Sequence, residues 1–441
     1  MAQGQEGRSA DLEREVEQLK EINTRPFLGR LGGYFRFMGP AGMEAATTLG
    51  AGSFTAAVMA GATHGYDMLW VPFYSYLFGL FMLYLGAKFA IHRKDSIIEL
   101  QNQYHTKAVG SFSTGFVACF LAAVVFSFGQ YALGTDALAS MSKLMGFDFP
   151  RHINWVAIMA VSVGLSLLYG KSHRPVRFVE KSMQILIAIM LLTFLAVVVK
   201  TGINVPAMLR GVLVPSVPRG VEGIMVVIAG LTAAMGVMDW VQYHYASKTR
   251  GYTRHHEQLS VFDSIFGGLI PVTLVLAFIG IAFAETFAGK TGIPESAMDL
   301  SNALVSVLPS VWVRVGFYLG IIAIVVSTMV GMPIVSAQSL CHSLNLPQDT
   351  NSLVWKIGLL LPHIGFLGAF IGKPLWAVIT VAAMQSLFNW LSGFSWYLLG
   401  NDIRALGSHV VKSYLVNLGI IVSIVALNLV FITFVLTELG V

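Results

Sequence analysis

One ionisable side chain stands out in the sequence because it lies within a long apolar run. Asp239 follows Met238 and precedes Trp240 inside residues 224–246, a largely apolar stretch. An ionised carboxylate at the centre of a bilayer is costly unless it faces water, a cation or a proton path. Asp239 is therefore expected to meet a cation or carry a proton, unless it pairs with a basic residue from another helix. No predicted span carries Lys or Arg near its centre.

A second unusual segment lies near the N-terminus, where small residues interrupt another apolar run. Gly50-Ala51-Gly52-Ser53 occupies the middle of residues 34–62. Glycine in a helix interior costs about 1 kcal/mol relative to alanine, so unwinding is cheap there. Backbone groups freed in this way need a cavity or a ligand. Alternatively, the glycines allow two helices to pack closely.

The positions of the two interruptions favour unwinding over close packing. They lie in the first and sixth predicted spans, an offset of five, so residues 34–199 and 224–399 become candidate repeats that each begin with a broken helix. This is the sequence pattern of an inverted-repeat transporter with a substrate site at mid-membrane. The predicted substrate-binding residues are Gly50, Ala51, Gly52, Ser53, Met235, Met238, Asp239, Trp240 and, from the tenth span, Gln385.

The elements that must position these residues are transmembrane helices. The 441 residues are 55% hydrophobic and only 12% charged, and the mean hydropathy is +0.70, which indicates a polytopic membrane protein. A crossing needs roughly 20 mostly apolar residues. Eleven such runs are predicted: 34–62, 69–90, 109–141, 155–169, 178–199, 224–246, 262–287, 311–340, 353–371, 375–399 and 414–436.

Charge distribution predicts the orientation. The segment 1–33 is basic and has no apolar core, so it is not a signal peptide. Most Lys and Arg fall on its side of the membrane, which places the N-terminus in the cytoplasm and the C-terminus outside the plasma membrane. Residues 11–22 are expected to form a charged, solvated helix, 34–399 the transporter core, and 400–441 an extra transmembrane helix.

Several classes of protein are excluded. A net charge of +5 is too small and scattered for a nucleic-acid partner. The two cysteines, Cys119 and Cys341, are too few for a disulfide framework or a Cys-based zinc site. No catalytic motif or phosphate loop indicates an enzyme. No cofactor is expected, and the partners are the lipid bilayer and a small transported solute or ion.

Several motifs resemble one known family, the Nramp divalent-metal transporters, over nearly the whole chain from Gly29. They are Gly39-Pro40-Ala41, the stretch from Gly61 to Trp70, Val214-Pro215-Ser216-Val217-Pro218, Val237-Met238, Tyr243, Ser247, Asp263, Gln385, Asn401, Arg404 and Gly407. The resemblance implies a LeuT-like fold of five plus five inverted repeats with helices one and six interrupted. It also implies proton-coupled import of a divalent metal.

The chain departs from this family at the metal site. Gly50-Ala51-Gly52-Ser53 stands where the family has Asp-Pro-Gly-Asn, and Met238-Asp239-Trp240 where it has Met-Pro-His. The candidate metal ligands are then Met238 and Asp239. One carboxylate in a polar cavity suits a hydrated cation such as magnesium better than manganese or iron.

Two alternatives and a proton path stay open. The glycine-rich break resembles the segment with which amino-acid transporters of this fold hold a substrate carboxylate, so the solute is alternatively a small organic molecule. A non-transporting sensor is the second alternative. The proton path is expected to use Asp239, His244 on the following turns of the helix, and Glu44, which precedes Gly50.

Overall fold

The computed structural model describes residues 2–169, 173–218, 220–287, 297–304, 310–370 and 389–438, and all regular structure in these ranges is helical. The α-helices are α1 (Ala2–Thr24), α2 (Phe27–Tyr34), α3 (Pro40–Thr48), α4 (Ala51–His64), α5 (Trp70–His92), α6 (Ile97–Tyr104), α7 (Ala122–Leu144), α8 (Arg151–Leu168), α9 (His173–Thr201), α10 (Val205–Leu213), α11 (Val221–Met235), α12 (Val237–Arg250), α13 (Glu257–Asp263), α14 (Ile270–Phe287), α15 (Ala297–Leu304), α16 (Val311–Ser343), α17 (Leu353–Leu360), α19 (Asn389–Asn401), α20 (Ile403–Leu406) and α21 (Tyr414–Glu438). Two π-helices, η2 (Ala108–Leu121) and η4 (Ser264–Leu269), and four 3-10 helices, η1 (Gly65–Met68), η3 (Arg254–His256), η5 (Leu361–Phe370) and η7 (Gly407–His409), join them. The all-helical class predicted from the sequence is confirmed.

Eight helices in the described residues are long and apolar enough to cross a membrane. They are Trp70–His92, Ala108–Leu144, Arg151–Leu168, Arg174–Thr201, Val221–Arg250, Arg254–Phe287, Arg314–Ser343 and Leu353–Phe370. The first predicted span is divided between α3 and α4, and the last coincides with α21. Residues 371–388, which include 375–388 of the tenth span, lie outside the described residues, so the count of eleven stays a prediction.

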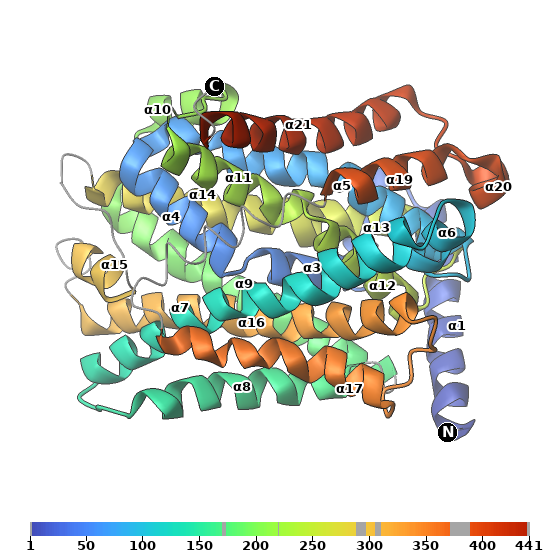
Figure 1. Ribbon diagram of the computed structural model, residues 1–441, viewed down its shortest axis with the longest axis horizontal. Helices are drawn as coiled ribbons and strands as arrows, with labels where there is room; N and C mark the ends of the chain where they lie inside the picture. Colours follow the sequence, from blue (N-terminus) through green and yellow to red (C-terminus); the bar gives the residue numbers. More distant parts are fainter. Residues whose placement is uncertain are drawn as a thin grey trace.

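The long helices run lengthwise through the molecule, and α16 lies at the centre (Figure 1). The most apolar window of α16 is 89% buried, whereas that of α8 is 22% buried. The outer helices instead expose large apolar side chains such as Ile185 and Leu192 on α9. An apolar periphery around a buried centre is what lipid requires of a helix bundle.

Both predicted interruptions are present. α3 ends at Thr48 and α4 begins at Ala51, because Leu49 and Gly50 leave the helical conformation. α11 ends at Met235 and α12 begins at Val237, with Gly236 extended at φ −80° and ψ 143°. The prediction that the first and sixth helices are broken is confirmed.

Helix α1 lies across one end of the bundle (Figure 1), and a buried ion network holds it there. Glu15 accepts from Arg177 of α9 at 2.5 Å and from Arg250 of α12 at 3.3 Å, and it lies 3.7 Å from His256. Arg250 also pairs with Glu180 at 2.5 Å. The predicted charged helix therefore exists and is longer than expected, but one face of it is buried rather than solvated.

The environment of Glu15 favours its ionised form. Burial alone raises the pKa, but the nearby His256 ring and the charges of Arg250 and Arg177 outweigh it and lower the pKa from 4.5 to about 2. A carboxylate with a lowered pKa stabilises the fold fully above its unfolded pKa, and this contribution disappears as the pH falls from about 4.5 towards 2.

We expect Glu15→Gln to lower the melting temperature at neutral pH, because it removes a shift equivalent to about 3 kcal/mol. The difference from wild type should shrink as the pH falls below about 4.5. Thermal unfolding of the detergent-solubilised protein across this pH range measures both.

The matched control is Glu17→Gln on the same helix, because Glu17 is exposed and pairs only with Lys20. Equal melting temperatures for Glu15→Gln and Glu17→Gln at pH 7.5 would show that the network does not hold α1.

Candidate functional site

The two helix breaks lie next to each other in the core. The Thr48 hydroxyl at the end of α3 lies 3.4 Å from Asp239 Oδ1 on the first turn of α12. The Ser53 hydroxyl on α4 donates to the carbonyl oxygens of Thr48 at 2.6 Å and Gly50 at 3.1 Å. Side chains therefore satisfy part of the backbone that the first break frees.

Each break has a glycine at a position where a larger residue would be crowded by its neighbours. A Cβ atom at Gly50 would lie 2.9 Å from Thr328 Oγ1 and 3.0 Å from Gln130 Nε2. A Cβ atom at Gly236 would lie 2.8 Å from Asp239 Oδ2. The glycines thus let polar side chains approach the unwound backbone.

A cavity with an empty volume of about 380 Å³, here called the polar cavity, lies between the breaks. Its lining combines one carboxylate, several hydroxyls, an amide and two thioethers with a few apolar groups. The lining residues are Thr47, Thr48, Gly50, Gly52, Ser53, Phe126, Gln130, Ala229, Thr232, Ala233, Met238, Asp239, Thr328 and Met332.

Two buried carboxyl groups belong to one hydrogen-bond network at this cavity. Thr48 Oγ1 lies 2.8 Å from Glu44 Oε1 as well as 3.4 Å from Asp239 Oδ1, and the Tyr76 hydroxyl donates to Glu44 Oε2. Glu44 is completely buried and Asp239 is 5% exposed. Within the described ranges neither forms a salt bridge with a Lys, Arg or His side chain. Positive charge for this network must therefore come from protons or from a bound cation.

Helix α16 fixes the first break from the other side. Ser327 Oγ donates to the Ala46 carbonyl at 2.7 Å, and Thr328 Oγ1 donates to the Thr47 carbonyl at 3.2 Å. Gln242 Nε2 of α12 donates to Thr47 Oγ1 at 2.7 Å. Hydrogen bonds therefore connect the first broken helix both to the continuous α16 and to the second broken helix.

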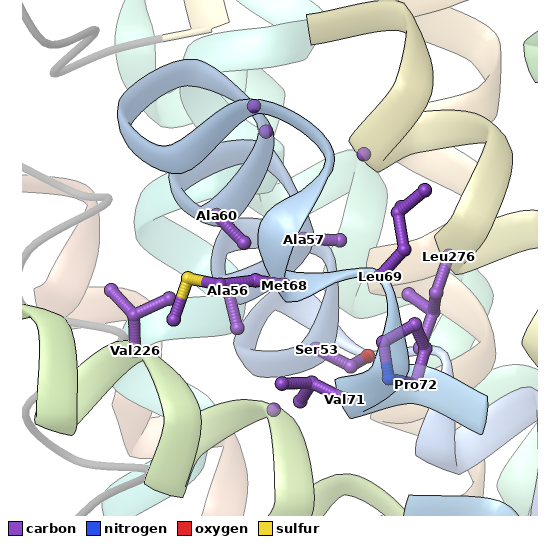
Figure 2. A pocket seen from close by; sticks show the side chains of 14 residues that line it. Ser53, Ala56, Ala57, Ala60, Met68, Leu69, Val71, Pro72, Val226 and Leu276 are labelled. Carbon is purple, nitrogen blue, oxygen red and sulfur yellow. The ribbon is translucent and has the colours of Figure 1, made fainter. Parts of the chain in front are cut away.

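A second, apolar cavity of about 390 Å³ extends from Ser53 along α4 towards Gly65. Figure 2 shows alanine, valine and leucine side chains around it, with the Ser53 hydroxyl at one end. Because Ser53 lines both cavities, the apolar cavity adjoins the polar cavity and follows α4 away from the first break.

A third cavity, here called the α12 cavity, lies along α12 and has an empty volume of about 780 Å³. Tyr245 and Lys248 of α12 and His342 of α16 are among its lining residues, and the Tyr245 hydroxyl lies 2.7 Å from His342 Nδ1. The two half-helices after the breaks, α4 and α12, thus line cavities on opposite sides of the site.

The structure brings five of the predicted substrate-binding residues to the polar cavity: Gly50, Gly52, Ser53, Met238 and Asp239. Ala51 instead donates its backbone N–H to Gln130 Oε1 at 3.0 Å. Met235 packs in an apolar cluster, and the Trp240 indole donates to the Ala234 carbonyl and packs on Trp396. Gln385 lies outside the described residues.

The three residues of the predicted proton path differ in placement. Asp239 and Glu44 share the network with Thr48. His244 bonds only to backbone in the described structure: Nδ1 lies 3.0 Å from the Gly86 carbonyl, and Nε2 accepts from the Ile97 N–H at 3.1 Å. These bonds connect α12 with α5 and α6.

Nine of the fourteen lining residues were not among the predicted substrate-binding residues, and four of these nine come from other helices: Gln130 and Phe126 of α7 and Thr328 and Met332 of α16. Near them on α7, the Tyr131 hydroxyl bonds to His363 Nδ1 at 2.7 Å and does not line the cavity. An available signal was the polar residue inside an apolar run, a group that includes Gln130 on α7 and Thr328 on α16.

Comparison with known proteins gives a consistent result. The profile of the Nramp family, described as natural resistance-associated macrophage protein-like, matches residues 43–436. The divalent metal cation transporter MntH of Aeromonas hydrophila is 24% identical over 262 residues, which cover 59% of this chain and 58% of that protein. The match thus spans less than two thirds of this relative.

Solved structures show the same fold. A variant of the manganese transporter of Eremococcus coleocola aligns with a TM-score of 0.72 and 15% identity, over 93% of this chain and 88% of that one. MhsT in complex with L-phenylalanine aligns with a TM-score of 0.60 and 14% identity, over 90% and 96%. The LeuT-like architecture expected from the sequence is confirmed.

We expect His244→Ala to destabilise the protein by about 1–3 kcal/mol, because it leaves the buried Ile97 N–H without its partner. A fall in melting temperature measures this effect, with His152→Ala on an exposed residue as the control. An unchanged melting temperature would contradict this structural role, and proton flux per folded molecule then tests the relay directly.

Proposed function

Because this chain belongs to the Nramp family, we propose that it is a secondary transporter that moves a divalent metal ion across the plasma membrane through the polar cavity. Members of this family are membrane transporters and not enzymes. The observation that carries the proposal is the pair of buried carboxyl groups of Glu44 and Asp239, joined by Thr48 without a basic partner in the described structure. A dication supplies the positive charge that this pair lacks.

The chemistry of the lining favours a cation that keeps part of its water shell. Asp239 is the one carboxylate in the described lining, and hydroxyl and amide oxygens outnumber the thioethers of Met238 and Met332. Magnesium binds through one or two carboxylates and retains several waters, so it is the first candidate. Manganese is the competitor, because thioethers suit a softer ion than magnesium.

Transport through this site requires access from both sides in turn. We place the N-terminus in the cytoplasm, so the apolar cavity along α4 leads outward and the α12 cavity leads inward. Movement of the half-helices α4 and α12 relative to α16 would open one route while the other is closed. The Glu44–Thr48–Asp239 network is the proposed place where a proton is exchanged for the cation.

One observation favours a second candidate, a small zwitterionic solute. Gly52 and Ser53 at the N-terminus of α4 line the same cavity as Asp239. A helix N-terminus attracts a carboxylate, and Asp239 could accept an amine. This candidate is weaker because the cavity holds an acidic group and no basic side chain among its described lining residues.

We expect proteoliposomes containing the purified protein to take up magnesium or manganese under an inward proton gradient. Asp239→Asn should lower the initial rate by at least about tenfold, because it removes the charged ligand. The control is Asp148→Asn, which changes an exposed carboxylate outside the cavity. Fluorescent indicators inside the vesicles measure both ions.

Absence of uptake for every divalent ion, with folded and inserted protein, would contradict metal transport. Uptake of labelled amino acids that disappears in Asp239→Asn would then establish the second candidate. Metal uptake that survives Asp239→Asn would instead move the cation site away from α12.

A further inference from the structure

A separate group of side chains with metal-binding chemistry lies outside the three cavities. It consists of His92, the last residue of α5, Glu257, the first residue of α13, and His409, the last residue of η7. One ligand atom from each residue lies within 4.8 Å of the other two. In the described part of the chain, this is the one group of three or more His, Cys, Asp or Glu side chains with that geometry.

The three side chains are already in contact. His92 Nε2 lies 2.6 Å from Glu257 Oε1, and the His92 and His409 rings stack with centroids 3.9 Å apart and an angle of 15° between their planes. Small rotations of the side chains would therefore bring two imidazole nitrogens and one carboxylate oxygen around a common point.

The burial of the group suits an exchangeable ion. The His92 side chain is only 5% exposed, whereas the Glu257 side chain is 50% exposed and His409 is partly buried. One ligand is thus held by packing, and the open side admits an ion and a water molecule from solution.

From this geometry we infer that His92, Glu257 and His409 form a binding site for a transition-metal dication, with zinc as the best fit. Two imidazoles and one carboxylate, with a fourth position for water, form a common three-residue zinc ligand set. Imidazole nitrogen favours zinc, copper, nickel and iron over magnesium, which binds oxygen ligands. The site therefore selects a different class of ion from the hydrated cation proposed for the polar cavity.

A bound ion would connect parts of the chain that are far apart in the sequence. α5, α13 and η7 contribute one ligand each, and η7 follows α20 at the end of the molecule where α1 lies (Figure 1). Because the three ligands come from the ends of three elements, the ion would hold these ends together. Zinc on this side would thus restrict the motions that accompany transport.

Zinc and cobalt titrations of the purified full-length protein in detergent test this site. We expect wild type to bind cobalt with the visible absorption of a four-coordinate ion with nitrogen ligands, and zinc to displace it. His409→Gln and Glu257→Gln should each weaken binding by at least about tenfold. Both positions are solvent-accessible, so these variants should fold.

The matched control is His152→Gln, because His152 is an exposed histidine on α8, away from the cluster. It should leave the cobalt spectrum and the zinc affinity unchanged. Metal binding at the polar cavity is distinguished by Asp239→Asn, which should leave the four-coordinate cobalt signal intact.

A cobalt signal absent from the wild-type protein, or unchanged in both His409→Gln and Glu257→Gln, would overturn the inference. A signal lost in Asp239→Asn but kept in His409→Gln would also overturn it, by assigning the ion to the polar cavity. These outcomes do not depend on transport activity, so the two proposals fail separately.

Discussion

A backbone inside a membrane must have its hydrogen bonds satisfied within the protein, usually by a continuous helix. The rest of this structure depends on the two places where the helix is interrupted and other partners are needed. At Leu49–Gly50 and at Gly236 the helical ladder stops within the core. Ser53, Gln130 and Thr328 supply side-chain partners around the first break. Each freed backbone group thus attracts polar side chains, and these create a polar cavity where a continuous helix would have packed against apolar neighbours.

The cavity in turn determines how charge is distributed in the fold. Two buried acids at the centre have hydroxyl partners, namely Glu44 and Asp239. Two others, Glu15 of α1 and Glu180 of α9, have arginine partners where α1 packs on the bundle. The arginine partners of Glu15 favour its ionised form, and the ion pairs of this network stabilise one arrangement of the helices. An acid paired with hydroxyls can bind and release a proton or a metal cation, as a transport site requires.

Much of the fold and part of the site could be predicted from the sequence. Glycine and small polar residues within apolar runs located both breaks, because glycine weakens a helix interior and so marks where the helix can unwind. The sequence could not show which faces of α7 and α16 meet the cavity, because neighbouring helices determine the rotation of an apolar span. Gln130 and Met332 were missed for this reason. The burial of Glu15 was not predicted, because the sequence pattern of a charged helix is the same whether its face contacts water or buried arginines.

The network under α1 also constrains the order in which the protein can assemble. Glu15 is synthesised first, but its partners Arg177 and Arg250 follow 162 and 235 residues later. At about 5–20 residues per second, α1 waits roughly ten seconds to under a minute for these arginines. During this time its carboxylate has no buried partner and the helix must stay at the membrane surface. Docking of α1 is therefore a late event in biogenesis, because it requires that α12, which carries Arg250, is already in position.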